Sequence, residues 1–168
     1  MFCGAKVDVF SVMCKHFLKK VVPLPQKHDK IDMKSDKFQI VRLPEYADAR
    51  GCLNVVEDDG SLPFVPSRVF WITGVPKGAR RGGHAHWTCS EIVFAAAGSF
   101  VIELDDGEAR STFVLDNPGL GVLVPAGAWC ELYDFAENTV CMVLASEKYD
   151  ASGYVHEKEE WRRLKNED

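Results

Sequence analysis

The chain of 168 residues lacks the features that mark several classes of protein. Its six cysteines form no C-x-x-C pair, so they indicate reduced thiols rather than a disulfide framework. Basic residues are not in excess, since the formal net charge is −5, and this argues against nucleic-acid binding. No apolar run approaches the roughly 20 residues of a membrane-spanning helix.

The N-terminal segment also lacks the pattern of a signal peptide. Its apolar stretch is interrupted at Lys6, Asp8, Lys15 and His16, and no small-residue cleavage site follows. We therefore expect a cytoplasmic protein with no membrane partner.

The sequence divides into three expected parts. Residues 1–36 are expected to be an N-terminal extension that ends in a polar, proline-containing linker. Residues 37–156 carry short β-rich runs and have the length of one compact domain. Residues 157–168 hold the only long helical pattern after the extension, EKEEWRRLK, and are expected to form a C-terminal helix.

The β-rich runs are separated by turn residues, as in an all-β sandwich or jelly-roll barrel. A DDG turn at 105–107 indicates a hairpin. Just before it, Phe100, Ile102 and Leu104 recur at every second position, the period of a half-buried strand. The runs cover residues 38–43, 52–57, 67–73, 91–97, 99–104, 109–115, 120–124, 129–135 and 139–145.

Two histidines, His84 and His86, lie one residue apart within this β-rich region. On a strand their side chains point to the same face, and Glu91 follows them closely in the sequence. The residues allow three interpretations. The three side chains hold a metal ion, with the Cys130 thiolate as an additional soft ligand. Alternatively, the histidines act as general base and acid near neutral pH. In the third interpretation they are simply hydrogen-bonded inside the fold.

The spacing around these residues resembles the two motifs of the cupin superfamily, whose members are small β-barrels of the jelly-roll type. The stretch GARRGGHAHWTCSEIVFAAAG (78–98) matches the glycines, the histidine pair and the glutamate of the first motif. The stretch GLGVLVPAGAWCELYD (119–134) matches the glycines and the proline of the second motif. It has Cys130 in place of a third histidine and Asp134 in place of an asparagine.

Within the cupins, the chain from about Phe38 to Tyr154 resembles the sugar 3,4-ketoisomerases, which act on dTDP-4-keto-6-deoxyglucose. The Arg-Gly before the histidine pair and the VLAS…YD ending are distinctive of that family. The matching segments are ARG (49–51), PFVPSRVFWITGVP (63–76), RGGHAH (81–86), GSFVIELDDG (98–107), LDNPGLGVLVPAGAW (115–129), DF (134–135) and MVLASEKYD (142–150).

The resemblance implies an isomerase that needs no cofactor and no metal, and that forms homodimers. It would move the keto group of a dTDP-linked 4-keto-6-deoxyhexose from C4 to C3 through an enediol, in the synthesis of deoxysugars for surface polysaccharide. By match to the family, His86 is the base that removes the C3 proton and His84 is its partner. The expected substrate-binding residues are Arg50, Arg81, Arg68, Glu91 and Cys130.

Three positions depart from the usual pattern of that family. The strand that holds Phe70 and Trp71 has no tyrosine, a residue that can serve there as an acid. Cys130 replaces a histidine, and Glu91 stands where many ketoisomerases have glutamine. Two alternatives therefore stay open. One is a metal-dependent cupin that uses the histidine pair, Glu91 and Cys130 as ligands, and the other is a cupin that binds a sugar without turnover.

Overall fold

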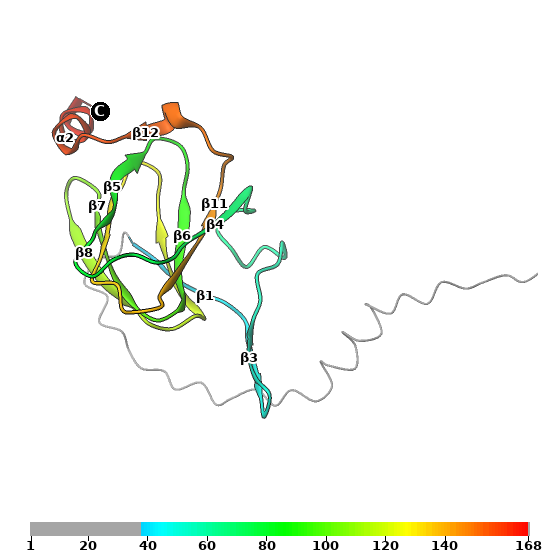
Figure 1. Ribbon diagram of the computed structural model, residues 1–168. Coiled ribbons are helices and arrows are strands. Elements are labelled where there is room, and N and C mark those ends of the chain that lie inside the picture. Colours follow the sequence, from blue (N-terminus) through cyan, green and yellow to red (C-terminus); the bar gives the residue numbers. More distant parts are fainter. Residues whose placement is uncertain (1–37, 168) are drawn as a thin grey trace, which may run out of the picture.

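The structure, a computed structural model that describes residues 38–167, consists of two antiparallel sheets packed face to face (Figure 1). The first sheet has the strand order β1 (Ile40–Arg42), β9 (Leu120–Val124), β6 (Glu91–Ala97), β11 (Val140–Ala145) and β4 (Arg68–Ile72). The second sheet has the order β12 (Tyr154–Val155), β5 (Arg81–His86), β10 (Trp129–Tyr133), β7 (Phe100–Asp105) and β8 (Arg110–Leu115). A separate hairpin is formed by β2 (Glu45–Asp48) and β3 (Gly51–Asn54). This architecture confirms the predicted all-β, jelly-roll class. The extension expected over residues 1–36 lies outside the described residues.

The core between the sheets follows from the alternation of side chains along each strand. On β7, Phe100, Ile102 and Leu104 are at most 1% exposed, as their period of two predicts. Strand β6 lies in the middle of its sheet and is buried on both faces. Val93 faces the core between the sheets, whereas Phe94 packs on the outer face beneath the segment that precedes β4. The continuous apolar run EIVFAAA is therefore the signature of a strand covered on both sides.

The predicted hairpin at 105–107 is present, and it joins β7 to β8. Gly107 adopts a positive φ of 98°, and the Asp106 carboxylate accepts hydrogen bonds from the backbone N–H groups of Glu108 and Ala109. Each predicted β-run overlaps a strand. Three strands lie outside those runs, namely β2, β5 and β12.

A helix, α2 (Lys158–Glu167), forms where the sequence predicts one, and it packs against the end of the second sheet (Figure 1). Its anchor is Trp161, which is fully buried and donates a hydrogen bond from Nε1 to the Gly127 carbonyl at 2.9 Å. The same side chain packs with Ala85, Trp129 and Val155, so the helix packs against residues of the strands β5, β10 and β12. Within the described part of the chain, no helix is long and apolar enough to cross a membrane.

Candidate active site

The two histidines predicted to carry the chemistry lie side by side on β5. Their ring centroids are 5.0 Å apart, and His86 is 6% exposed. Two glycines precede the pair, and both have a positive φ, 73° at Gly82 and 72° at Gly83. A Cβ on Gly82 would lie 2.6 Å from the carbonyl oxygen of Cys130, so only glycine lets β5 approach β10 this closely. The Arg-Gly-Gly stretch therefore sets the path of β5 that leads to the histidine pair.

Two neighbouring strands bring further side chains to the histidines. On one side Tyr154 of β12 pairs with His86, and on the other Cys130 of β10 pairs with His84. Residues opposite each other in an antiparallel pair share a face of the sheet. The Tyr154 ring accordingly contacts both histidine rings in a tilted arrangement, with centroid distances of 4.2 Å to His86 and 5.1 Å to His84.

The facing sheet contributes a carboxylate and a guanidinium. Glu91 Oε1 lies 3.5 Å from His86 Nε2 and 3.6 Å from an Arg68 side-chain nitrogen. Arg68 and Glu91 are not on adjacent strands, since both pair with Ala145 of the strand between them. The small, fully buried alanine leaves room for the arginine to reach across to the carboxylate.

Burial favours the uncharged forms of the His86 imidazole and the Glu91 carboxyl over a wide pH range. It lowers the pKa of His86 to about 4, and the positive charges of His84, Arg68 and His156 act in the same direction. Burial also raises the pKa of Glu91 to about 7, against the opposing effect of Arg68. At neutral pH His86 is therefore a neutral imidazole. The buried His86 Nε2 has no hydrogen-bond partner among the described residues.

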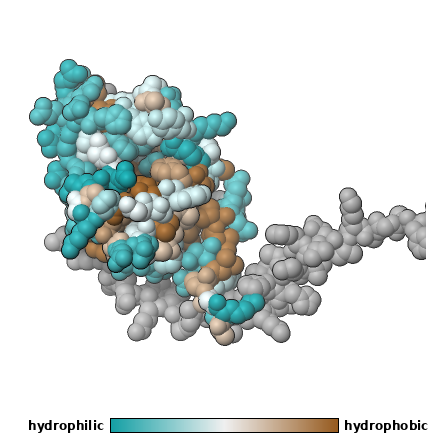
Figure 2. Space-filling view, in the orientation of Figure 1, coloured by the Kyte–Doolittle hydropathy of each residue, from teal (hydrophilic) through white to brown (hydrophobic). Residues whose placement is uncertain are grey.

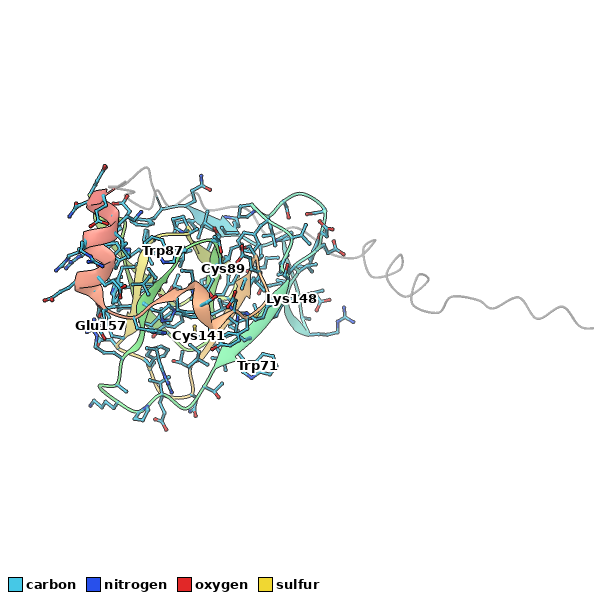
Figure 3. The ribbon with its side chains drawn as sticks, turned by 90° about the horizontal axis from the view of Figure 1, so that it is seen from above. Trp71, Trp87, Cys89, Cys141, Lys148 and Glu157 are labelled. Atoms are coloured by element: carbon cyan, nitrogen blue, oxygen red, sulfur yellow. The ribbon has the colours of Figure 1, made fainter. Side chains whose placement is uncertain are left out.

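Cys130 belongs to the hydrophobic core between the sheets, and burial raises the pKa of its thiol far above the usual range. It therefore stays a protonated thiol, which packs as a small apolar side chain. Residues 38–167 contain no group of three or more His, Cys, Asp and Glu side chains arranged to hold a metal ion. Figure 3 shows two other cysteines, Cys89 and Cys141, in the interior, and Trp71 pointing away from the molecule.

Two of the predicted substrate-binding residues do not join this cluster within one chain. Arg50 lies at the turn of the β2–β3 hairpin, which projects away from the two main sheets, and it is paired with Asp48 (Figure 1). Arg81 is exposed at the start of β5, five residues from His86, which corresponds to about 16 Å along a strand. The structure thus gathers His84, His86, Glu91, Arg68 and Cys130, and leaves the two other arginines outside.

Tyr154, which contacts both histidines, is not among the site residues predicted from the sequence. Tyr149 extends this aromatic side of the site, with its ring centroid 5.8 Å from that of Tyr154 and 5.6 Å from the Arg68 guanidinium carbon. A weak signal was present in Tyr-Val-His (154–156), where polar aromatic residues flank a buried valine as in a short strand. Tyr154, His86 and Arg68 line a small cavity of about 30 Å³. This volume is large enough to hold one water molecule or one oxygen atom of a ligand.

The chain is similar to proteins of established activity over most of its length. Residues 36–166 match the family FdtA, described as WxcM-like, C-terminal. The chain is 31% identical over 125 residues to the TDP-4-oxo-6-deoxy-alpha-D-glucose-3,4-oxoisomerase of Aneurinibacillus thermoaerophilus, a match that covers 74% of this chain and 90% of that protein.

Solved structures give the same result. A variant of the 3,4-ketoisomerase QdtA from Thermoanaerobacterium thermosaccharolyticum, in complex with TDP-4-keto-6-deoxyglucose, is 28% identical with a TM-score of 0.76. That match covers 79% of this chain and 96% of the QdtA chain. The WlaRB TDP-quinovose 3,4-ketoisomerase from Campylobacter jejuni is 30% identical, with a TM-score of 0.72 and coverage of 77% and 99%.

Proposed function

The chain belongs to the FdtA family of sugar 3,4-ketoisomerases and is an isomerase, and we propose that it moves the keto group of a dTDP-linked 4-keto-6-deoxyhexose from C4 to C3. The observation that carries this proposal is the state of His86. It is a neutral imidazole in a buried site, with a ring nitrogen that has no hydrogen-bond partner among the described residues. A proton next to a carbonyl is weakly acidic, and a neutral imidazole with an unpaired ring nitrogen can accept it as a general base.

In the proposed reaction His86 takes the proton from C3, and an enediol forms between C3 and C4. The imidazolium then has the Glu91 carboxyl 3.5 Å away, and the ionised form of that carboxyl stabilises it. Because burial raises the pKa of Glu91 to about 7, this help is available at neutral pH and above. The Arg68 Nε atom, buried and without a hydrogen-bond partner among the described residues, is suited to bind a sugar or phosphate oxygen.

The test is an NMR time course with purified protein and dTDP-4-keto-6-deoxyglucose in D2O, after the metal content has been measured. We expect a 3-keto product that carries deuterium at C4 where the proton on His86 exchanges with solvent, formed by metal-free protein and unaffected by a chelator. His86→Asn should lose turnover while its unfolding midpoint and its affinity for dTDP stay close to those of the wild type. If the wild type binds the nucleotide sugar but forms no 3-keto product and exchanges no proton, the isomerase proposal is wrong and a sugar-binding role replaces it.

We also propose that the active form is a cytoplasmic homodimer. All four cysteines in residues 38–167 are free thiols, which suits a reducing compartment. Among the described strands β4 pairs only with β11, so one of its edges is open, and it exposes Val69 (52%) and Trp71 (68%). Figure 2 shows hydrophobic residues gathered on the side of the molecule that carries β4 and the β2–β3 hairpin. An open edge with an exposed apolar face is a surface that proteins usually cover.

Analytical ultracentrifugation tests the dimer. We expect the wild type to sediment as a dimer and Trp71→Lys to shift it toward the monomer. Val114→Lys is the matched control, because Val114 is as exposed (66%) but lies on β8 of the other sheet. A wild type that sediments as a monomer at micromolar concentration contradicts the proposal.

A further inference from the structure

The Tyr154 hydroxyl is a proton-bearing group at the histidine pair to which the steps above give no role. Tyr154 is half-buried, and its ring lies on His86 at a centroid distance of 4.2 Å. It reaches this position because β12 pairs with β5 in a register that places Tyr154 opposite His86. Tyr154 lines a small cavity together with His86 and Arg68, so its phenol lies beside space that a ligand oxygen can occupy.

Moving a ketone from C4 to C3 requires proton transfers at oxygen as well as at carbon. When the C3 proton leaves, the C4 ketone oxygen gains a proton and the enediol forms. When C4 is protonated, the hydroxyl at C3 loses its proton and becomes the new ketone. His86 serves the carbon atoms, so a second group is needed for the two oxygen atoms. These oxygens are on adjacent carbons, so one hydroxyl group can serve both.

We propose that Tyr154 is this second group, a catalytic acid and base for the two sugar oxygens; the inference rests on the isomerase proposed above. Its phenol donates its proton to O4 while His86 removes the proton from C3. The resulting phenolate then takes the proton of O3 while the His86 imidazolium returns a proton to C4. In the first half a C–H and an O–H bond break, and an N–H bond on His86 and an O–H bond at O4 form. In the second half that N–H bond and the O–H bond at O3 break, and a C–H bond at C4 and the Tyr154 O–H bond form. Both side chains therefore end in their starting states.

The other nearby tyrosines and the strand β4 are less suited to the role. Strand β4 presents Phe70 and Trp71, which have no hydroxyl group. Tyr149 is 67% exposed, so water competes for its hydroxyl. Tyr133 lies on β10, and its ring centroid is 4.3 Å from the guanidinium carbon of Arg80, against which it stacks. His84, 5.0 Å from His86, is the competing candidate.

The experiment compares the full-length wild type, Tyr154→Phe and Tyr133→Phe in the NMR assay with dTDP-4-keto-6-deoxyglucose. General acid–base groups contribute about 100-fold or more, so kcat of Tyr154→Phe should fall by at least about 100-fold. Its affinity for dTDP should change little, and Tyr133→Phe should behave as the wild type does. A second variant carries a fluorinated tyrosine at position 154. It keeps the hydroxyl and the ring, and its more acidic phenol should move the alkaline limb of the kcat profile to lower pH.

The outcomes separate this inference from the proposal on which it rests. Wild-type protein without turnover overturns both. Active wild type with equally active Tyr154→Phe overturns only the role of Tyr154 and assigns the oxygens to His84. A loss of activity in Tyr154→Phe with no displacement of the limb in the fluorinated variant also overturns it, because the hydroxyl would then act by binding the substrate rather than by transferring protons.

Discussion

Replacing Glu91 by glutamine is expected to change how the stability of the protein depends on pH. Glu91 is 7% exposed, and burial raises the pKa of its carboxyl from 4.5 to about 7. The folded state therefore binds this proton more tightly than the unfolded state. The stability that the group contributes is complete below pH 4.5 and is lost as the pH rises through 7. At about 1.36 kcal/mol for each pH unit, the loss reaches about 3 kcal/mol by pH 8.

Glutamine has nearly the same shape as protonated glutamate, but it does not titrate. Glu91→Gln should therefore match the wild type at pH 5 to within the effect of the amide itself, and should gain about 3 kcal/mol relative to it by pH 8. Urea denaturation followed by tryptophan fluorescence at several pH values between 5 and 8 measures this difference. Glu137→Gln, at an exposed loop position, is the matched control and should differ from the wild type by a constant amount. A constant difference for Glu91→Gln as well would refute the burial argument.

Three further predictions concern His86, Trp161 and Gly121. Because burial lowers the pKa of His86 to about 4, kcat/KM of Glu91→Gln, which lacks the carboxyl that titrates near 7, should hold as the pH falls below 6 and should decline only near pH 4; a decline centred on 6.5 contradicts the buried imidazole. Trp161→Ala should lower the free energy of unfolding by about 3–5 kcal/mol in urea denaturation, since it empties a fully buried site and leaves the Gly127 carbonyl without its partner. Gly121→Ala should cost about 1–3 kcal/mol by the same measurement, because the added Cβ overlaps the buried Phe94 ring, whereas Gly153→Ala meets no atom within 4 Å and should cost less.

The strands that were predicted best are those whose signal is local. The alternation on β7 and the DDG turn after it are properties of neighbouring residues, and both are present in the structure. The strands outside the predicted runs have weaker local signals. Strand β2 reads EYAD, β12 is only Tyr-Val, and β5 contains two glycines. Such segments become strands because a partner strand accepts their hydrogen bonds, and the partner is distant in the sequence.

The composition of the site shows the same division. The sequence placed His84 and His86 on one face, since two residues on a strand alternate predictably, and the structure has their rings 5.0 Å apart. Its assignment of substrate-binding roles to Arg50 and Arg81 stays a prediction, because within one chain neither lies with the histidines. Tyr154 was not selected, because its contact with His86 depends on the register between β12 and β5.

The sequence by itself determined the β-rich class, the hairpin at 105–107, the terminal helix and the pairing of two histidines on one face. These features depend on the period of side chains along a strand or helix and on the φ preferences of glycine, which act over a few residues. Only the tertiary structure decided that Glu91 and Arg68 meet His86 from the opposite sheet and that Tyr154 contacts its ring. It alone also decided that His86 and Glu91 have strongly shifted pKa values. The reason is that desolvation and cross-sheet contacts depend on how completely the two sheets exclude water, and this is a property of the packed molecule rather than of any segment.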